Sequence, residues 1–251
     1  MKAKDIILKA ISSKDADRVI RACHYSGKVV PNSQLHFGIF LKGKCGGAMS
    51  FGPSMRKDLI APLVSDTKWN NFLELNRMAF ADWLPRNSES RAISVAMRII
   101  RKQYPHVEWV VSFADATQCG DGTIYRASGF ALTGIKENSQ MAINPETGEM
   151  LHKIAAYHQG KEYEHSKWEK VKGYMLRYIY FISPTSRSRL TVPEIPFSEI
   201  QARGAGMYRG KPKGAVSIGG NASDIQSEDG GSTPTTALHF KSKEGEQNGK
   251  D

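Results

Sequence analysis

Cysteine is scarce in this sequence, and no two cysteines form a CxxC pair. The three cysteines, Cys23, Cys45 and Cys119, are scattered over 251 residues. A sparse, odd count is typical of reduced thiols inside a cell, because disulfide scaffolds need many paired cysteines. The pattern therefore excludes a disulfide-stapled fold and a cysteine-based zinc module.

Long hydrophobic runs are also missing. The most apolar segment, residues 174–182, is interrupted by Arg177 and is too short to cross a bilayer. The first 18 residues are charged throughout and lack the apolar core of a signal peptide. We therefore expect a soluble, cytoplasmic protein with no membrane partner.

Acidic residues are few compared with basic ones. The chain has 25 Asp and Glu against 35 Lys and Arg, so the formal net charge is +10 and the pI is near 9.5. Such a charge favours a polyanionic partner, with nucleic acid ranked before an anionic membrane. Hydrophobic residues make up 40% of the chain, which is enough for a sizeable core.

Large apolar residues become rare towards the C-terminus. Residues 202–251 are rich in Gly, Ser, Lys and Thr, and we expect them to form a disordered tail. Residues 184–201 are expected to form a basic extension, and residues 1–183 a folded domain. The basic residues between Arg177 and Lys213 either contact a nucleic-acid backbone or belong to a solvated tail.

Residues 72–105 have the clearest secondary-structure pattern. Residues 72–80 alternate with the period of a strand, and apolar residues at helical spacing then run up to Pro105. Asn87 or Ser88 can cap this helix. A strand followed by a capped helix directs free backbone N–H groups at one spot, which suits an anion such as phosphate. The alternative is an ordinary strand–helix unit with a good cap.

The other segments predict a mixed α/β fold. Helices are expected over residues 13–27 and 123–128, and strands over residues 35–41, 46–51, 108–114, 130–135 and 174–182. The polar loop of residues 115–122 joins a buried strand to a short helix. Loops of this kind carry function on a rigid scaffold.

The order of these segments resembles the GNAT-type N-acetyltransferase fold. Residues 123–130, TIYRASGF, are similar to a late helix of that family, in which a tyrosine stands four residues before a Gly-Phe pair, as Tyr125 does here. The resemblance implies a central mixed, mostly antiparallel sheet flanked by helices. It also implies acetyl-CoA as donor and Tyr125 as the acid that protonates the leaving thiolate.

The phosphate-binding turn departs from that family's pattern. The family's turn is glycine-rich, whereas residues 86–91 here, RNSESR, contain no glycine and include Glu89. If this turn binds a donor, two arginines can compensate partly by charge. The predicted donor contacts in the turn are then Arg86, Asn87, Ser88, Ser90 and Arg91.

Longer stretches resemble the Mom family of bacteriophage DNA-modification proteins. They are residues 23–28, 32–40, 50–52, 74–78, 84–91 and 112–130. The resemblance implies that the domain converts adenine in DNA to N6-carbamoylmethyladenine, which protects phage or prophage DNA from restriction in the bacterial host cell. The family's metal-binding or catalytic cluster corresponds to His24, Tyr25, Asp115 and Tyr125, and its donor-binding arginine to Arg77.

Each of these residues also has a simpler interpretation when it is taken alone. A histidine at a helix end often caps carbonyls, a carboxylate after a strand can cap the next turn, and a tyrosine at the core edge packs its ring. Together, His24, Tyr25, Asp115 and Tyr125 suit iron better than zinc, which prefers Cys and His. The same groups can form a metal-free acid/base site, and the sequence leaves both alternatives open.

Two donors can be compared through the carbamoylmethyl product. Acetyl-CoA would place an acetyl group on N6, and the product would then need a C–H oxidation and another nitrogen. An activated glycine, such as glycyl-tRNA, supplies every atom without redox chemistry. The glycine-free turn and the basic charge favour activated glycine, which makes tRNA a possible partner beside the double-stranded DNA that the resemblance implies. The alternatives are a metal-assisted acetyl-CoA reaction, a non-catalytic DNA-binding protein and a small-molecule N-acetyltransferase.

Overall fold

The computed structural model describes residues 2–118, 120–208 and 211–212. Its elements in chain order are η1 (Ala3–Asp5), β1 (Ile7–Ala10), α1 (Ser13–Cys23), β2 (Leu35–Leu41), β3 (Lys44–Gly52), α2 (Lys57–Ile60), η2 (Ala61–Leu63), β4 (Phe72–Phe80), α3 (Ser88–Gln103), β5 (Trp109–Asp115), α4 (Thr123–Ala127), β6 (Ala131–Ile143), β7 (Met150–His152), α5 (Lys153–His158), α6 (Glu162–Ser166), β8 (Glu169–Phe181), α7 (Pro184–Ser188), α8 (Ser198–Ala202), β9 (Met207–Tyr208) and β10 (Lys211–Pro212).

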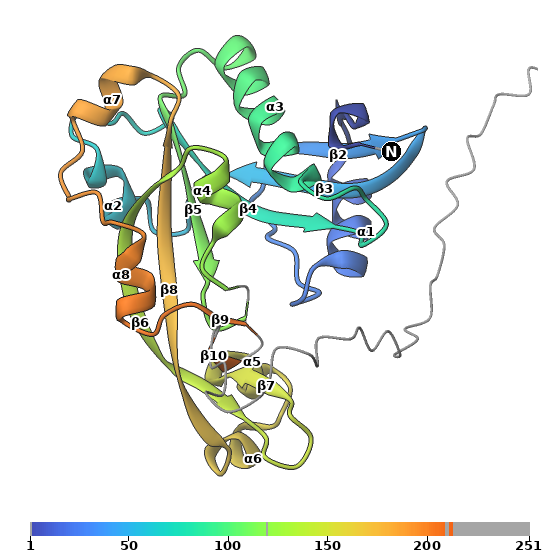
Figure 1. Ribbon diagram of the computed structural model, residues 1–251, viewed down its shortest axis with the longest axis vertical. Helices are drawn as coiled ribbons and strands as arrows, with labels where there is room; N and C mark the ends of the chain where they lie inside the picture. The colour runs from blue at the N-terminus through green and yellow to red at the C-terminus, as the bar shows by residue number, and fades with distance from the viewer. Residues whose placement is uncertain (1, 119, 209–210, 213–251) are drawn as a thin grey trace, which may run out of the picture.

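An eight-stranded sheet forms the centre of the molecule (Figure 1), with the strand order β1-β2-β3-β4-β5-β8-β6-β7. Its neighbouring strands are antiparallel, except that β4 and β5 are parallel. β9 and β10 form a separate two-stranded ribbon. A mixed, mostly antiparallel sheet flanked by helices confirms the predicted α/β fold class.

The parallel pairing of β4 with β5 is short. It runs from Phe72 opposite Trp109 to Glu74 opposite Val111. The rings of Phe72 and Trp109 stack at this end, with their centroids 4.5 Å apart. The later halves of both strands instead line a cavity between them, which is the site described below.

A β-bulge lies on β4 at the start of that later half. Ser50 of β3 faces Arg77, while the next residue, Phe51, faces Leu75, so Asn76 is the extra residue. Bulges bend a strand and are common beside active sites. The bulge at Asn76 comes two residues after Glu74, the last residue of β4 that pairs with β5.

Helices α1 and α3 cover opposite faces of the sheet. Met49 of β3 belongs to the core cluster that holds Ile93 and Ile100 of α3, whereas its neighbour Ala48 packs with Val19 of α1. Successive residues of a strand point to opposite faces, so the two clusters lie on the two sides. The cavity between β4 and β5 is thus flanked by α1 on one side and α3 on the other.

Strands β6 and β8 run past the rest of the sheet and carry a small lobe at their far end (Figure 1). This lobe, residues 144–168, contains β7, α5 and α6. The predicted turn at Asn144 opens it, and the Asn144 side chain accepts a hydrogen bond from Glu146 N at 2.8 Å. Its two helices were not predicted.

Most of the predicted elements are confirmed, and β4 has the predicted bounds. The predicted cap of α3 by Asn87 is wrong, because Asn87 has a left-handed backbone (φ 69°) and its side chain forms no cap hydrogen bond. Ser88 does not cap by its side chain either, since its hydroxyl donates to Pro85 O at 2.6 Å. A tight turn closed by backbone atoms therefore starts this helix.

Residues after β8 pack against the sheet. Ile195 N donates to Leu132 O at 2.8 Å, and Ile200 and Ala205 are buried in the main core cluster. The division of the chain at residues 183 and 201 stays a prediction, and residues 213–251 of the predicted tail lie outside the described residues. In the part that the structure describes, no helix is long and apolar enough to cross a membrane.

Candidate active site

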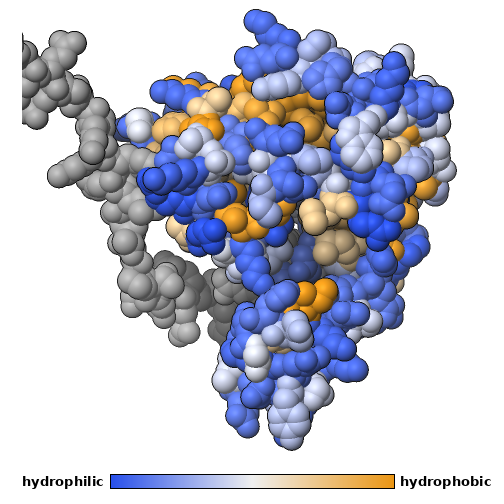
Figure 2. Space-filling model, turned by 180° about the vertical axis from the view of Figure 1, so that it is seen from behind, coloured by the Kyte–Doolittle hydropathy of each residue, from blue (hydrophilic) through white to orange (hydrophobic). Residues whose placement is uncertain are grey.

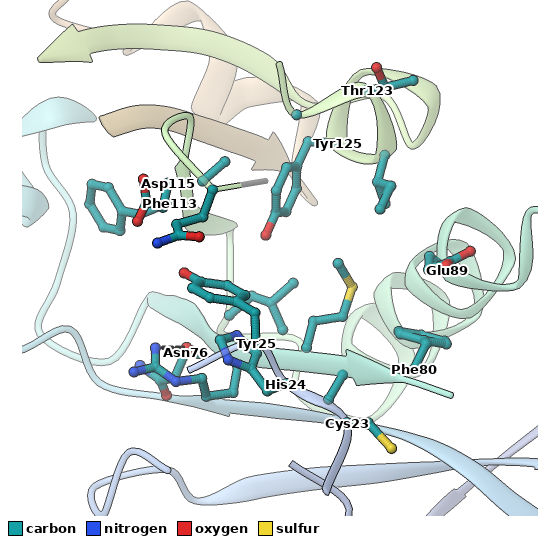
Figure 3. A pocket seen from close by; sticks show the side chains of 18 of the residues that line it. Cys23, His24, Tyr25, Asn76, Phe80, Glu89, Phe113, Asp115, Thr123 and Tyr125 are labelled. Carbon is teal, nitrogen blue, oxygen red and sulfur yellow. Dashed lines mark hydrogen bonds between the residues drawn. The ribbon is translucent and has the colours of Figure 1, made fainter. Parts of the chain in front are cut away.

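A cavity of about 760 Å³ lies between the later halves of β4 and β5 (Figure 3). Its size is typical of small-molecule sites. The end of α1, both strands, the loop after β5 and helices α3 and α4 contribute its lining, which comprises Cys23, His24, Tyr25, Leu75, Asn76, Arg77, Met78, Ala79, Phe80, Glu89, Phe113, Ala114, Asp115, Gln118, Asp121, Gly122, Thr123, Ile124 and Tyr125. The predicted cluster of His24, Tyr25, Asp115 and Tyr125 therefore shares one cavity with Arg77.

His24 is the C-cap residue of α1. Its Nδ1 accepts a hydrogen bond from Ser26 N at 3.1 Å and lies 2.8 Å from the Ser26 hydroxyl. Burial, together with the positive charge of Arg77, lowers the pKa of His24 from 6.5 to about 4. The imidazole is therefore neutral at pH 7, and because Nδ1 accepts, we assign its proton to Nε2.

Tyr25 stacks on His24, with the ring centroids 4.3 Å apart. The side chain of Tyr25 is 59% exposed. Figure 3 shows its ring lying between His24 and the strand that carries Asp115. Tyr25 therefore forms part of the rim of the cavity and not of the hydrophobic core.

Arg77 joins the loop after α1 to the bulge of β4. Its Nε donates to Lys28 O at 3.0 Å, and its Nη1 donates to Asn76 O at 2.8 Å. Its charge also counteracts the burial that raises the pKa of Glu74. Arg77 thus holds the His24 loop against β4 while it contributes a positive charge to the cavity wall.

Asp115 ends β5, and one of its carboxylate oxygens accepts a hydrogen bond from Thr117 N at 2.9 Å. The side chain therefore caps the following turn, as the simpler interpretation predicts, and it also lines the cavity. The charge of Asp115 also acts on His152, which lies in the lobe. Burial lowers the pKa of His152, and the negative charge of Asp115 acts against that lowering.

Tyr125 is held by an aromatic stack and a buried hydroxyl. Its ring stacks on Tyr178 at 5.0 Å and meets Phe130 edge-on at 5.3 Å. The fully buried Ser112 of β5 has its Oγ 2.9 Å from Tyr125 Oη and 3.4 Å from Leu75 O. The Tyr125 phenol therefore points to the place where β4 and β5 diverge.

Tyr178 packs against the Tyr125 ring and holds the loop that precedes α4. Its hydroxyl donates to Asp121 O at 2.6 Å, and burial, followed by the negative charge of Asp121, raises its pKa well above the usual value. Tyr178 is therefore a structural phenol that fixes the loop before α4. Asp121 Oδ1 in turn accepts from Thr123 N at 3.1 Å and holds the first turn of α4.

The predicted donor-binding turn lies mostly outside the cavity. Glu89 belongs to the lining, whereas Arg86, Asn87, Ser88, Ser90 and Arg91 do not. The hydroxyl of Ser90 donates to Asn87 O at 3.2 Å, so it stays within its own turn. The role of these five residues in donor binding stays a prediction, and the charge that the turn presents to the cavity is negative.

The lining of the cavity is acidic although the protein is basic. Glu89, Asp115 and Asp121 contribute three carboxylates, and Arg77 contributes the cation. His24 adds no charge at pH 7, because its pKa is about 4. An ammonium group suits this lining better than a pyrophosphate does.

Sequence reasoning missed Ser112, Asn76 and Asp121 as site residues. Ser112 and Asn76 lie inside strands, where a single polar residue is usually read as part of a solvated face. Ser112 could have been found, because it interrupts the apolar run of residues 109–114 that leads into the polar loop of residues 115–122, whereas Asn76 lies between Glu74 and Arg77 and gives no such signal. Glu89 was noticed only as a departure from a glycine-rich turn.

The residues fit the predicted iron poorly. A metal bound at His24 Nε2 would require the proton on Nδ1, but Nδ1 accepts from the Ser26 backbone N–H. Among the described residues, no three His, Cys, Asp or Glu side chains converge as a metal site. We therefore derive no catalytic step through a metal.

Comparison with known proteins adds two kinds of similarity. The model of the Mom protein family matches residues 5–199. A protein of Escherichia phage Mu described as methylcarbamoylase mom is 37% identical over 197 residues, which cover 75% of this chain and 80% of that protein.

Solved structures show a weaker likeness. The ribosomal-protein-S18-alanine N-acetyltransferase from Escherichia coli is 10% identical, with a TM-score of 0.43 over 71% of this chain and 94% of that chain. A Bacillus subtilis acetyltransferase in complex with CoA is also 10% identical, with a TM-score of 0.43 over 70% of this chain and 97% of that chain.

Proposed function

Because the chain belongs to the Mom protein family, we propose that it is a transferase that converts adenine in DNA to N6-carbamoylmethyladenine. The description of the phage Mu relative as a methylcarbamoylase supports this product. The convergence of His24, Tyr25, Asp115, Tyr125 and Arg77 on one cavity carries the proposal. The modified base protects phage or prophage DNA from restriction in the cytoplasm of the bacterial host.

The acceptor in this proposal is an adenine that has left the duplex. The N6 atom of a paired adenine is engaged in the base pair, so the enzyme must flip the base or act on unpaired DNA. A cavity of about 760 Å³ accommodates a purine together with a small acyl group. The net charge of +10 supports binding to the phosphates.

The donor in this proposal is an activated glycine ester, such as glycyl-tRNA. Its α-ammonium group suits a cavity lined by Glu89, Asp115 and Asp121, whereas the pyrophosphate of coenzyme A would face like charges. Glu89 stands at the position where a pyrophosphate turn would use glycine. The basic surface supports binding of tRNA as a second polyanion.

In the first step, adenine N6 attacks the glycyl carbonyl carbon. An N6–C bond forms and the ester C–O bond breaks, so the tRNA hydroxyl leaves. We assign Asp115 as the base that accepts the N6 proton and Tyr125 as the acid that protonates the leaving oxygen. The neutral His24 donates from Nε2 to the carbonyl oxygen, with Tyr25 as the wall that holds the base.

In the second step, the product of the first step rearranges. The glycyl ammonium loses a proton, and the resulting amine attacks adenine C6 through a five-membered ring. The C6–N6 bond breaks as N6 takes up a proton. The former N6 becomes the amide nitrogen, which gives the N–CH2–CO–NH2 group. Both compounds have the same atoms, so the step needs no oxidant or reductant.

Nucleoside mass measurement after co-expression with a plasmid tests the reaction. We expect adenosine with a carbamoylmethyl addition in the wild-type sample. Asp115→Ala and Tyr125→Phe should abolish it while the far-ultraviolet circular dichroism stays unchanged. Wild-type levels in either variant would remove the role of that residue, and unmodified plasmid with the wild-type protein would favour a non-catalytic DNA-binding protein or a small-molecule acetyltransferase.

Isotope labelling tests the donor. Label from glycine should enter the carbamoylmethyl group, and glycine nitrogen should be found bonded to purine C6. The original N6 should appear as the terminal amide. Label from acetate without label from glycine would instead support the acetyl-CoA route.

A further inference from the structure

The lobe of residues 144–168 stands beside the cavity. Tyr174 N of β8 donates to Thr117 Oγ1 at 3.2 Å, so the base of the lobe is fastened to the loop that follows Asp115. The charge of Asp115 also acts on His152, the N-cap residue of α5. Figure 2 shows a hollow between the body and the lobe, with hydrophobic side chains of the lobe along its edge.

Helix α5 has an apolar surface that the described residues leave uncovered. Ile154 is 59% exposed and Tyr157 is 64% exposed. They are three residues apart on α5, so they lie on the same face of the helix. Tyr163 of α6 is exposed too, but the ammonium of Lys167 lies 4.0 Å from its ring centroid.

The charges of α5 suit a polyanion. No acidic residue occurs in the sequence between Glu149 and Glu162, whereas Lys153 and Lys161 do. Lys161 forms an ion pair with Glu149, so Lys153 is the lysine next to the exposed pair that has no such partner among the described residues. Helix α5 itself has one lysine and no carboxylate. An apolar helix face of this kind fits DNA better than it fits a hydrophobic core.

Base flipping creates a gap for such a face. An adenine that enters the cavity leaves its neighbours unstacked, and proteins that distort DNA often insert an apolar wedge at this place. A tyrosine ring can stack on the exposed bases, and an aliphatic side chain can fill the remaining volume. Ile154 and Tyr157 have this combination of shapes.

We propose that Ile154 and Tyr157 of α5 form a wedge that enters double-stranded DNA at the position vacated by the target adenine. This inference rests on the proposed function and names the element that opens the duplex. His152 at the start of α5 lies close enough to Asp115, which lines the cavity, for the two charges to interact, so one DNA duplex can contact both the lobe and the cavity. The wedge stabilises the open duplex and touches no reacting atom.

Two DNA substrates and one matched variant test the wedge. The substrates are a paired duplex and the target strand alone as single-stranded DNA, in which no duplex has to be opened. Tyr157→Ala should lose roughly tenfold or more activity on the paired duplex, the order expected for one lost stacking contact. Its activity on the single-stranded DNA should stay within about twofold of the wild type. Tyr163→Ala, an equally exposed tyrosine of the lobe, should behave like the wild type on both.

A fluorescence measurement follows the flipping step itself. 2-Aminopurine at the target position brightens when it leaves the stack, so the wild-type protein and Tyr163→Ala should raise its emission in the paired duplex. Ile154→Ala and Tyr157→Ala should raise it less. Equal loss on both DNA substrates, or wild-type activity of Tyr157→Ala on the paired duplex, would overturn the wedge. A wild-type protein that modifies neither substrate would overturn the proposed function and the wedge with it.

Discussion

At the scale of single residues, His24 shows how the site controls charge. A histidine at a helix C-terminus usually gains from the negative end of the dipole and keeps its proton more easily. Here burial and Arg77 act in the opposite direction, so the pKa is lowered to about 4. Protonation therefore opposes folding, and the stability that a neutral His24 contributes is lost as the pH falls from 6.5 towards 4.

The two causes of this pKa shift can be separated by mutation. Arg77→Gln removes a positive charge, so the pKa of His24 should rise above about 4 but stay below 6.5, because burial is the larger cause. The titration of the His24 ring protons by nuclear magnetic resonance measures it. Arg86→Gln, which removes a charge outside the cavity, serves as the control. An unchanged His24 pKa in Arg77→Gln would show that the arginine does not act on the ring.

Ser112 is expected to position the Tyr125 phenol. Ser112→Ala deletes the oxygen 2.9 Å from Tyr125 Oη, and we expect kcat to fall by about tenfold, as for one lost hydrogen bond, with KM for DNA little changed. The double variant with Tyr125→Phe should be no worse than Tyr125→Phe alone, because the serine acts through the phenol. Additive losses in this double-mutant cycle would show that Ser112 acts independently.

The sequence identified site residues unevenly for a physical reason. His24, Tyr25, Asp115 and Tyr125 were found through a family resemblance, and each alone fits a structural role. Asp115 plays its structural role as well, since it caps the turn at Thr117. Ser112 is a single polar residue in an apolar strand, but this pattern does not say where its hydroxyl points, because its neighbours across the sheet decide whether a strand hydroxyl faces water or a phenol.

At the scale of elements, regular hydrophobic patterns were readable and irregular ones were not. Strand β4 and helix α3 were predicted well because a strong period spans each of them. Strand β1 was missed because its residues, ILKA, are mostly exposed and its pairing with β2 fixes it. The bulge at Asn76 depends on the register with β3, which no local pattern encodes.

Gly122 is required in the loop that leads into α4. Gly122 has φ +67°, and a Cβ there would lie 2.5 Å from the Tyr178 hydroxyl oxygen. Gly148 in the lobe turn has φ +70° with open space around it. Gly148→Ala therefore has the cost of a positive φ without a clash, and it serves as the control. Gly122→Ala should therefore destabilise the protein by about 1–3 kcal/mol more than Gly148→Ala does. Urea unfolding midpoints with unchanged slope measure the difference, and equal midpoints would show that Tyr178 moves without cost.

At the scale of the whole molecule, charge is separated between surface and cavity. The net charge is +10, yet three carboxylates line the cavity against one arginine. The surface can therefore hold DNA phosphates while the interior selects a group of the opposite sign. Amino-acid composition predicts the basic net charge of the protein. It cannot predict the acidic lining of the cavity, because folding decides which few side chains face inward.

The C-terminal residues contribute no positive charge to the net total. Residues 213–251 contain four lysines and six acidic residues, so residues 1–212 carry more than the whole net charge of +10. A chain that ends at residue 212 keeps the buried Ala205 and should bind duplex DNA at least as tightly as the full chain. The plot of log affinity against log salt should keep its slope, because that slope counts phosphate contacts.

A surface lysine provides the comparison for this shortened chain. Lys28 is at an exposed position on the loop that Arg77 holds, and Lys28→Gln should reduce the slope by about 1 if the rim of the cavity contacts the DNA backbone. Weaker binding and a shallower slope in the shortened chain would show instead that the C-terminal lysines contact DNA.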